Sequence, residues 1–359
     1  MAVCCFAEKN KKHSKGSEPG DNKNTRLSSL VSGKNKINYL VLHALAAGER
    51  RKQMKKILII CLFVLTTASI IQADIFWGAA NSSESANSST AYDPILFKLD
   101  TATGTVGTTY AYSQWRTILD VAYAPGNILY VTHSSVSDTQ NNKTFMLAKV
   151  NASTGAVLSD TQINTLSGTD LPAWNALKYH NGKLYAVENC WREGDNNSAW
   201  DKRGYIYEVG LDSEGDPVSA VLGAYIGGYP APDGAIALKD GVWYVSDWRD
   251  DAPNASSWIK TSTDIMNNNF TGTLHTEPIG YFDGWDFEAD GDLIGVSWFS
   301  SYGMNVYEID LTTGAPTALY DIGSQLPSHI ISFSGLTAVP EPATLCLLAI
   351  GGLLLRKRS

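Results

Sequence analysis

The stretch Ile118-Leu119-Asp120-Val121-Ala122-Tyr123-Ala124-Pro125-Gly126-Asn127-Ile128-Leu129-Tyr130-Val131 decides the fold of this chain of 359 residues. Two runs rich in β-branched, aliphatic and aromatic residues flank a short turn sequence, which predicts a β-hairpin. Glycine supplies the positive φ that such turns need. The pattern recurs at residues 175–187, 234–245 and 285–296. Its turn glycines lie 50 to 59 residues apart and are Gly126, Gly182, Gly241 and Gly291.

A second repeated element lies between these hairpins. Residues 96–104 alternate apolar and polar side chains and end in Asp-x-x-Thr-Gly, and residues 147–155, 206–212 and 306–314 follow the same pattern. Alternation over this length predicts a third strand that turns into a fourth. In one repeat the element is degenerate, with Trp258-Ile259-Lys260 in its place.

Four strands every 50 to 60 residues predict an all-β fold, a β-propeller spanning residues 74–339. The N-terminal part supplies strands at 75–79, 95–100 and 106–112, and a strand at 331–339 would complete this first blade. Closure between the chain ends leaves no open edge, so we expect five four-stranded blades. Six blades are the alternative, if another blade lies within 250–282. The repeats resemble those of secreted bacterial propellers, a likeness of architecture that implies no activity.

The loops that enter the first strand and leave the second strand of each blade would line the mouth of the propeller, where we expect a ligand. Six of the ten tryptophans fall in or beside these loops. The candidate residues are Trp115, Arg116, His133, Trp174, Trp191, Arg192, Asp233, Asp247, Trp248, Arg249, Asp283, Trp298 and His329.

Tryptophans beside charged groups are typical of sugar recognition, because indole rings stack on sugar CH faces while Arg or Asp binds the hydroxyls. Packing between blades is the alternative explanation, and it applies first to Trp243 and Trp285, which lie inside predicted strands. We expect Trp191, Trp248 and Arg249 to hold the ligand. Asp233, Asp247 and Asp283 could instead supply an acid pair for glycoside hydrolysis.

No histidine spacing typical of a metal site is present, and we expect no cofactor or metal. Residues 286–292 imitate a calcium loop, but the twelfth position is Ser297 instead of glutamate. An Asp-Gly hairpin turn explains the stretch, and structural calcium is the less favoured alternative.

The body is strongly acidic. Between Asp74 and Pro340 the chain has 12 Lys/Arg and 31 Asp/Glu, a net charge of −19. Such a charge repels nucleic acid and anionic membranes, so we expect neither as a partner of the body. Of five cysteines only Cys190 lies in the body, which excludes an intrachain disulfide and a cysteine zinc site there.

The N-terminal part carries the features of a secretory signal. Residues 54–73 comprise a basic start, an apolar core at 57–64 and a small residue at the end, so we expect cleavage by signal peptidase between Ala73 and Asp74. We expect translation to begin at Met54, which makes residues 1–53 a mis-called extension. A genuine basic leader is the alternative.

The C-terminal part is tripartite. It consists of Val339-Pro340-Glu341-Pro342, an apolar run at 345–355, and Arg356, Lys357 and Arg358. Prolines keep the first part extended, and the basic cluster stops a helix that is short for a membrane span. An ordinary single-pass anchor is the alternative.

This tail, residues 340–359 with Val339, resembles the PEP-CTERM sorting signal. The resemblance implies that the tail holds a precursor in the inner membrane of a Gram-negative-type bacterium until an exosortase processes it. The product would then reach the cell surface or its polysaccharide matrix. We expect an exported propeller that binds a ligand of the polysaccharide class. A propeller glycosidase or lyase and a structural matrix protein are the alternatives.

Overall fold

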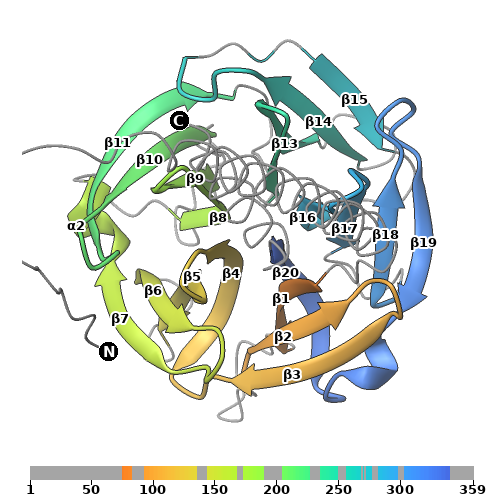
Figure 1. Cartoon of the computed structure of the whole chain (residues 1–359), viewed down its shortest axis with the longest axis horizontal. Helices are drawn as coiled ribbons and strands as arrows, with labels where there is room; N and C mark the ends of the chain where they lie inside the picture. Colours follow the sequence, from red (N-terminus) through yellow and green to blue (C-terminus); the bar gives the residue numbers. More distant parts are fainter. Residues whose placement is uncertain are drawn as a thin grey trace, which may run out of the picture. The chain divides into compact units, whose positions relative to one another are not determined.

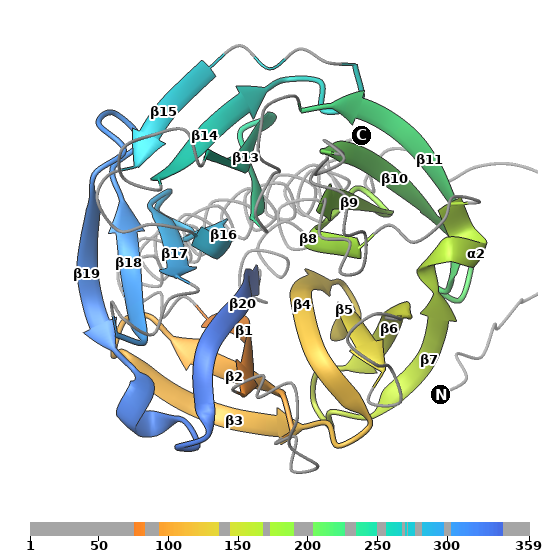
Figure 2. The ribbon, with the colours of Figure 1, turned by 180° about the vertical axis from the view of Figure 1, so that it is seen from behind.

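A computed structural model of the chain describes residues 75–82, 93–135, 144–167, 173–189, 204–226, 235–249, 256–267, 270, 272–276, 282–297 and 303–339. These residues form five four-stranded antiparallel sheets. Figures 1 and 2 show the sheets as blades of a ring, with β4, β8, β16 and β20 near the centre and β3, β7, β11, β15 and β19 at the rim. The prediction of an all-β, five-bladed propeller is confirmed, and the six-bladed alternative is wrong.

The blades have the following bounds. Blade 1 comprises β20 (Ile330–Val339), β1 (Ile75–Ser82), β2 (Ile95–Asp100) and β3 (Thr105–Ala111). Blade 2 comprises β4 (Trp115–Ala124), β5 (Ile128–Ser135), β6 (Phe145–Asn151) and β7 (Val157–Gln162), and the short helix α2 (Ile163–Ser167) follows it. Blade 3 comprises β8 (Ala173–His180), β9 (Lys183–Asn189), β10 (Tyr205–Leu211) and β11 (Pro217–Tyr225).

The last two blades follow the same order. Blade 4 comprises β12 (Ile236–Lys239), β13 (Val242–Arg249), β14 (Ser256–Ser262) and β15 (Gly272–Thr276), so the degenerate repeat with Trp258 is a strand. Blade 5 comprises β16 (Phe282–Phe287), β17 (Leu293–Ser297), β18 (Asn305–Ile309) and β19 (Pro316–Asp321), followed by the 3-10 turn η2 (Gly323–Gln325).

The ring closes in blade 1 with strands from both ends of the body. β20 pairs antiparallel with β1, and Val339 is the register partner of Ile75. The last strand therefore supplies the innermost position of the first blade, as predicted. Gln325 adds a second link, because its amide donates to Gly104 O at 2.8 Å and its Oε1 accepts from Val106 N at 2.8 Å.

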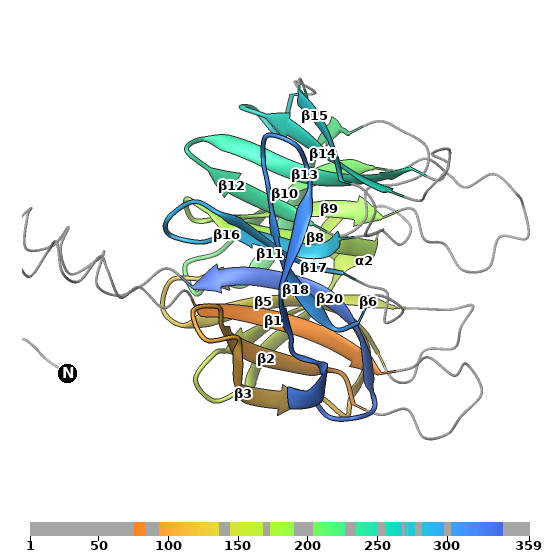
Figure 3. The same cartoon turned by 90° about the vertical axis from the view of Figure 1, so that its right-hand side faces the viewer.

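The first-to-second-strand turns contain the predicted glycines. In two of these turns both central residues have positive φ, namely Asn181 (50°) with Gly182 (81°) and Asp240 (51°) with Gly241 (78°). This is the pattern of the hairpin turns that match strand twist. We call the end of the ring that carries these turns the turn end, and the opposite end the loop end. Figure 3 shows the ring from the side, with the arrowhead of β20 at the end where β1 begins.

The Asp-x-x-Thr-Gly turns between third and fourth strands also lie at the turn end. The Asp310 carboxylate accepts hydrogen bonds from the amides of Thr312 and Thr313, which lowers the pKa of this carboxyl. Gly314 then takes a φ of 75°. Asn151 binds the amides of Ser153 and Thr154 in the same way, with Gly155 at 71°. A short polar side chain and a glycine therefore build each turn.

The core lies between adjacent blades. One apolar cluster joins Ala122 and Tyr130 of blade 2 to Trp174 and Leu184 of blade 3. Another joins Ile294 and Val306 of blade 5 to blade 1. Within the described ranges, no helix is long and apolar enough to cross a membrane. The predicted signal helix and the apolar run of the tail lie outside those ranges.

Candidate functional site

The structure places six of the predicted mouth residues at the loop end, including Arg116 in β4 and His329 just before β20. Trp115 and Trp174 lie at the start of the innermost strands β4 and β8, Asp283 lies near the start of β16, and His133 lies near the end of β5. Trp191, Arg192, Asp233 and Trp298 lie outside the described residues. For Asp247, Trp248 and Arg249 the structure describes the backbone of β13 and not the side chains. Their assignment stays a prediction.

Trp115 and His133 contact each other directly. The Trp115 ring lies between two others, 4.0 Å from Tyr112 and 4.1 Å from His133, measured between ring centroids, and both pairs are stacked. The Nε2 atom of His133 lies 3.1 Å from the Asp160 carboxylate, and Trp115 and His133 are only 4% and 2% exposed. Trp115 therefore uses its two faces for packing, and these two residues form part of the wall of the loop end.

Trp174 is fully buried against the next strands of its own blade. Its ring lies 5.5 Å from that of Tyr207, whose hydroxyl donates to Glu188 Oε2 at 3.1 Å. Glu188 is buried and is the register partner of Trp174 across β8 and β9. A carboxylate therefore sits beside a tryptophan at the loop end of blade 3.

Sequence reasoning missed Glu188, although the repeat contained the signal. His133, Glu188 and Asp247 each follow a strand tyrosine by three residues, after Tyr130, Tyr185 and Tyr244. This position is therefore polar in three consecutive blades. Three further mouth residues are described. Asp283 is buried, whereas Arg116 and His329 are half-buried, and all three interact with other residues.

The loop end also holds buried polar atoms whose hydrogen-bonding capacity is unused. In the part of the chain that the structure describes, Thr132 Oγ1, Ser134 Oγ, Trp174 Nε1 and Ser297 Oγ are buried and have no hydrogen-bond partner. Buried polar groups normally have one. These atoms come from blades 2, 3 and 5, so the feature belongs to this end of the ring and not to one blade.

A charged cluster joins the innermost strands nearer the turn end. The Lys178 ammonium of β8 donates to Asp286 Oδ2 of β16, which also accepts from Ala338 N at 2.8 Å and Thr337 Oγ1 at 3.3 Å on β20. The Asp286 side chain is 2% exposed. Hydrogen bonds from several donors are what a buried carboxylate needs, so this cluster fastens three blades together.

Asp120 of β4 lies beside this cluster. Its Oδ2 accepts from Leu177 N of the next blade, whereas Oδ1 is buried with no hydrogen-bond partner among the described residues. Burial raises the pKa of the Asp120 carboxyl well above its usual range, and the charge of Asp286 adds to this. The backbone amides of Val121 and Leu177 and the Lys178 ammonium act in the opposite direction. Asp120 is therefore a candidate neutral carboxylic acid near the axis.

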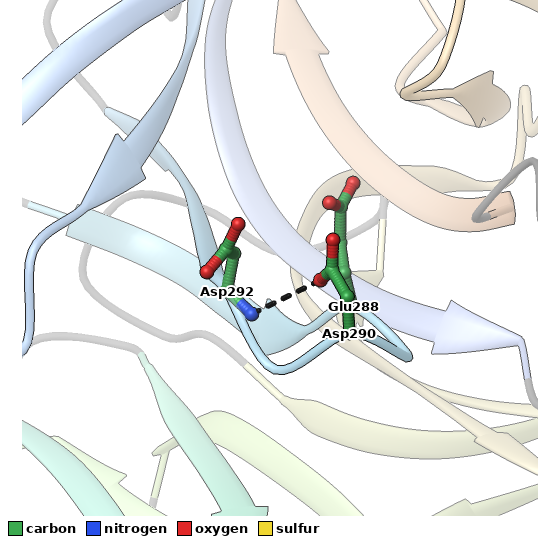
Figure 4. Close-up of side chains that lie close together, drawn as sticks. All are labelled: Glu288, Asp290 and Asp292. Atoms are coloured by element: carbon green, nitrogen blue, oxygen red, sulfur yellow. Dashed lines mark hydrogen bonds between the residues drawn. The ribbon is translucent and has the colours of Figure 1, made fainter. Parts of the chain in front are cut away.

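The stretch at residues 286–292, which imitates a calcium loop in sequence, forms the hairpin turn that the sequence favoured. Figure 4 shows Glu288, Asp290 and Asp292 close together, and their carboxylate oxygens lie within 4.8 Å of one another. The Asp292 amide donates to Asp290 Oδ1 at 3.2 Å, which belongs to the turn itself. Asp286, the first residue of this stretch, contacts Lys178. We assign no metal to this exposed turn.

Comparison with known protein families identifies the kind of segment that ends the chain. Residues 338–359 match the family model of the PEP-CTERM protein-sorting motif. The chain carries a PEP-CTERM sorting signal. This signal implies export, a membrane-anchored precursor and processing by an exosortase. No curated protein matches the chain.

Several solved structures match the chain at low identity. A protein of unknown function from Bacteroides caccae is 11% identical, with a TM-score of 0.40, and the match covers 75% of this chain and all of that one. A putative 6-phosphogluconolactonase from Bacteroides uniformis is 9% identical, with a TM-score of 0.41 and the same coverage. The native arabinanase of Bacillus subtilis is 15% identical, with a TM-score of 0.40, over 69% of this chain and 94% of its own. Similarity at this level does not indicate a shared activity.

Proposed function

We propose that the exported propeller is a polysaccharide-binding module whose ligand lies at the loop end. The observation that carries the proposal is the set of buried hydroxyl and indole N–H groups with unused hydrogen-bonding capacity in the described part of that end. A ligand rich in hydroxyl groups can donate to the threonine and serine oxygens and can accept from their hydroxyls and from the indole N–H. The loop tryptophans of the sequence add flat apolar faces for sugar rings.

The sorting signal indicates where the exported protein would meet a polysaccharide. Exported proteins that are released from the inner membrane meet the cell surface and its polysaccharide, and we propose this matrix as the final location. We also propose that signal peptidase removes the N-terminal segment between Ala73 and Asp74. The −19 charge of the body favours neutral or cationic matrix material as a ligand over anionic polymers.

A glycan-array screen of residues 74–339, with added calcium and an assay for cleavage products, tests the proposal. Specific binding without cleavage is the expected result. Cleavage would replace it with a propeller glycosidase or lyase that uses Asp233, Asp247 or Asp283. If no glycan on the array is bound or cleaved, a structural matrix protein without a ligand would be the better interpretation.

Two substitutions localise the binding. Trp248→Ala should weaken glycan binding by about tenfold or more, which corresponds to roughly 1.4 kcal/mol of lost stacking. Trp174→Phe removes Nε1–H together with part of the buried indole ring, so it should weaken binding and, through the lost packing, also lower the melting temperature. Asp240→Asn, an exposed change at the turn end, is the control and should leave binding intact. Unchanged binding by the first two variants would refute the assignment to the loop end.

A further inference from the structure

We infer that, in the membrane-anchored precursor, the turn end of the propeller faces the bilayer and the loop end points away from it. The inference rests on the sorting signal and on the topology of the ring. It holds whether or not the loop end binds a glycan.

The last described residue leaves the ring at the turn end. Thr337 Oγ1 accepts from Tyr123 N at 3.3 Å, and Asp286 accepts from Ala338 N and from Lys178. Each of these residues lies within the last three of its innermost strand. The C-terminal ends of β4, β8, β16 and β20 therefore lie together, next to the turns that follow the first three of these strands.

The connection from this point to the membrane is short. Only residues 340–344 separate Val339 from the apolar run at 345–355. A fully extended chain spans at most about 3.3–3.6 Å per residue, so these five residues reach roughly 17 Å. When the apolar run is inserted, the end of β20 must lie within this distance of the bilayer interface.

The position of the tether within the ring then sets the orientation. β20 is an innermost strand, so the chain leaves the ring near its axis and not at its rim (Figures 1 and 2). A short tether near the axis brings the whole turn end toward the bilayer. A tether at the rim would have allowed the ring to lie on its side.

The chemistry of the turn end indicates that the tail alone holds it there. Its turns expose carboxylates, and the exposed acidic residues are Asp212, Glu214, Asp240, Asp290, Asp292 and Asp310. The lysines in or next to these turns are engaged within the protein: Lys239 donates to Gly291 O, Lys149 to Glu214 O, and the half-exposed Lys183 to Glu208 Oε1. Anionic headgroups repel such a surface. The membrane-facing end therefore has no affinity of its own, and cutting the tail frees the body.

The test uses residues 74–359, the precursor after the signal-peptidase cut proposed above, in liposomes that contain anionic lipid and a headgroup-attached quencher. An environment-sensitive dye is placed by an unnatural amino acid at Asp240, exposed at the turn end, or at Gln114, exposed between β3 and β4 at the loop end. Because quenching falls steeply with distance, it should be at least about twofold stronger at Asp240 than at Gln114 when a tether of this reach holds the ring.

A longer tether is the matched control. Inserting 20 Gly/Ser residues between Val339 and Pro340 adds a flexible segment of roughly 25 Å root-mean-square length, and this should abolish most of the difference between the two labels. Equal quenching in the unmodified chain, or stronger quenching at Gln114, would overturn the inference. If the protein does not co-float with the liposomes in a density gradient, the inference is also overturned, because the tail would then not anchor the ring.

Discussion

At the scale of single residues, the side chain with the most unusual environment is Asp120. Its carboxyl is buried between blades 1, 2 and 3, and Gly335 lies so close that a Cβ there would be 2.2 Å from Oδ1. One oxygen binds a backbone amide of the neighbouring blade, and the other has no partner among the described residues. A charge at this position would be poorly solvated, so the neutral acid is the form that the fold accommodates.

Replacing Asp120 by Asn should stabilise the protein at neutral pH. The folded-state pKa is raised, so the unfolded chain ionises first, from about pH 3.9 upward, while the folded carboxyl still holds its proton. The wild type therefore loses stability as the pH rises from that value toward the folded pKa. Asn keeps an acceptor for Leu177 N and does not ionise.

Thermal unfolding of both proteins between pH 4 and pH 8 checks this prediction. The melting temperature of the Asp120→Asn variant should exceed that of the wild type by a few degrees at pH 8, since about 1 kcal/mol corresponds to roughly 2–4 °C at this size. The difference should shrink toward pH 4. A variant that is less stable at every pH would show that Asp120 is ionised and paired in the folded state.

At the scale of strands and turns, adjacent blades interlock through tyrosines. Tyr110 of β3 covers Gly155 in the turn of the next blade, and its hydroxyl donates to Ser153 O at 2.7 Å. Tyr320 of β19 covers Gly104 in the same way. The turn glycines therefore serve two needs, a positive φ and the close approach of an aromatic ring.

A pair of glycine substitutions separates these two needs. Gly126 and Gly155 both have positive φ, 82° and 71°, but a Cβ at Gly126 would meet nothing within 4 Å, whereas one at Gly155 would lie 2.5 Å from the Tyr110 ring. Gly126→Ala should cost roughly 1–2 kcal/mol through backbone strain alone. Gly155→Ala should cost about 1–3 kcal/mol more, because Tyr110 must move. Urea unfolding of both variants measures the difference, and equal losses would show that the tyrosine contact is dispensable.

The sequence predicted the elements well because their signals are local. Alternation and turn glycines predicted the four-strand repeat, and the spare strand at the C-terminus predicted where the ring closes. Contacts between blades were not predicted, because their partners are distant in the chain: Lys178 and Asp286 are 108 residues apart. Trp115 and His133 were predicted to lie at one end, and they do, but no local pattern indicated that their rings stack on each other.

At the scale of the whole molecule, Asp286 is a point where three blades meet. Its carboxylate binds β8 through Lys178 and β20 through Thr337 and Ala338. Removing it would leave a largely buried ammonium, with a side chain 16% exposed, opposite a backbone amide without its acceptor. The fastening of the last strand therefore depends on one side chain of blade 5.

Asp286→Ala should destabilise the ring by about 3–5 kcal/mol, the usual effect of removing one partner of a buried ion pair. Lys183→Ala is the matched control, because it removes half of an exposed ion pair with Glu208 and should change stability little. Denaturant midpoints with unchanged m-values would report both effects. Comparable losses for the two variants would refute a special role for Asp286.

The pairing of β1 with β20 also has a consequence for biosynthesis. One edge of β1 stays unpaired until β20 has been synthesised and secreted. Contacts between residues so distant in the chain form slowly. The sorting signal begins where that last strand ends. A chain cut short anywhere in the body therefore lacks both the closing strand and the sorting address. Incomplete copies of the protein are thus excluded from sorting by their own topology.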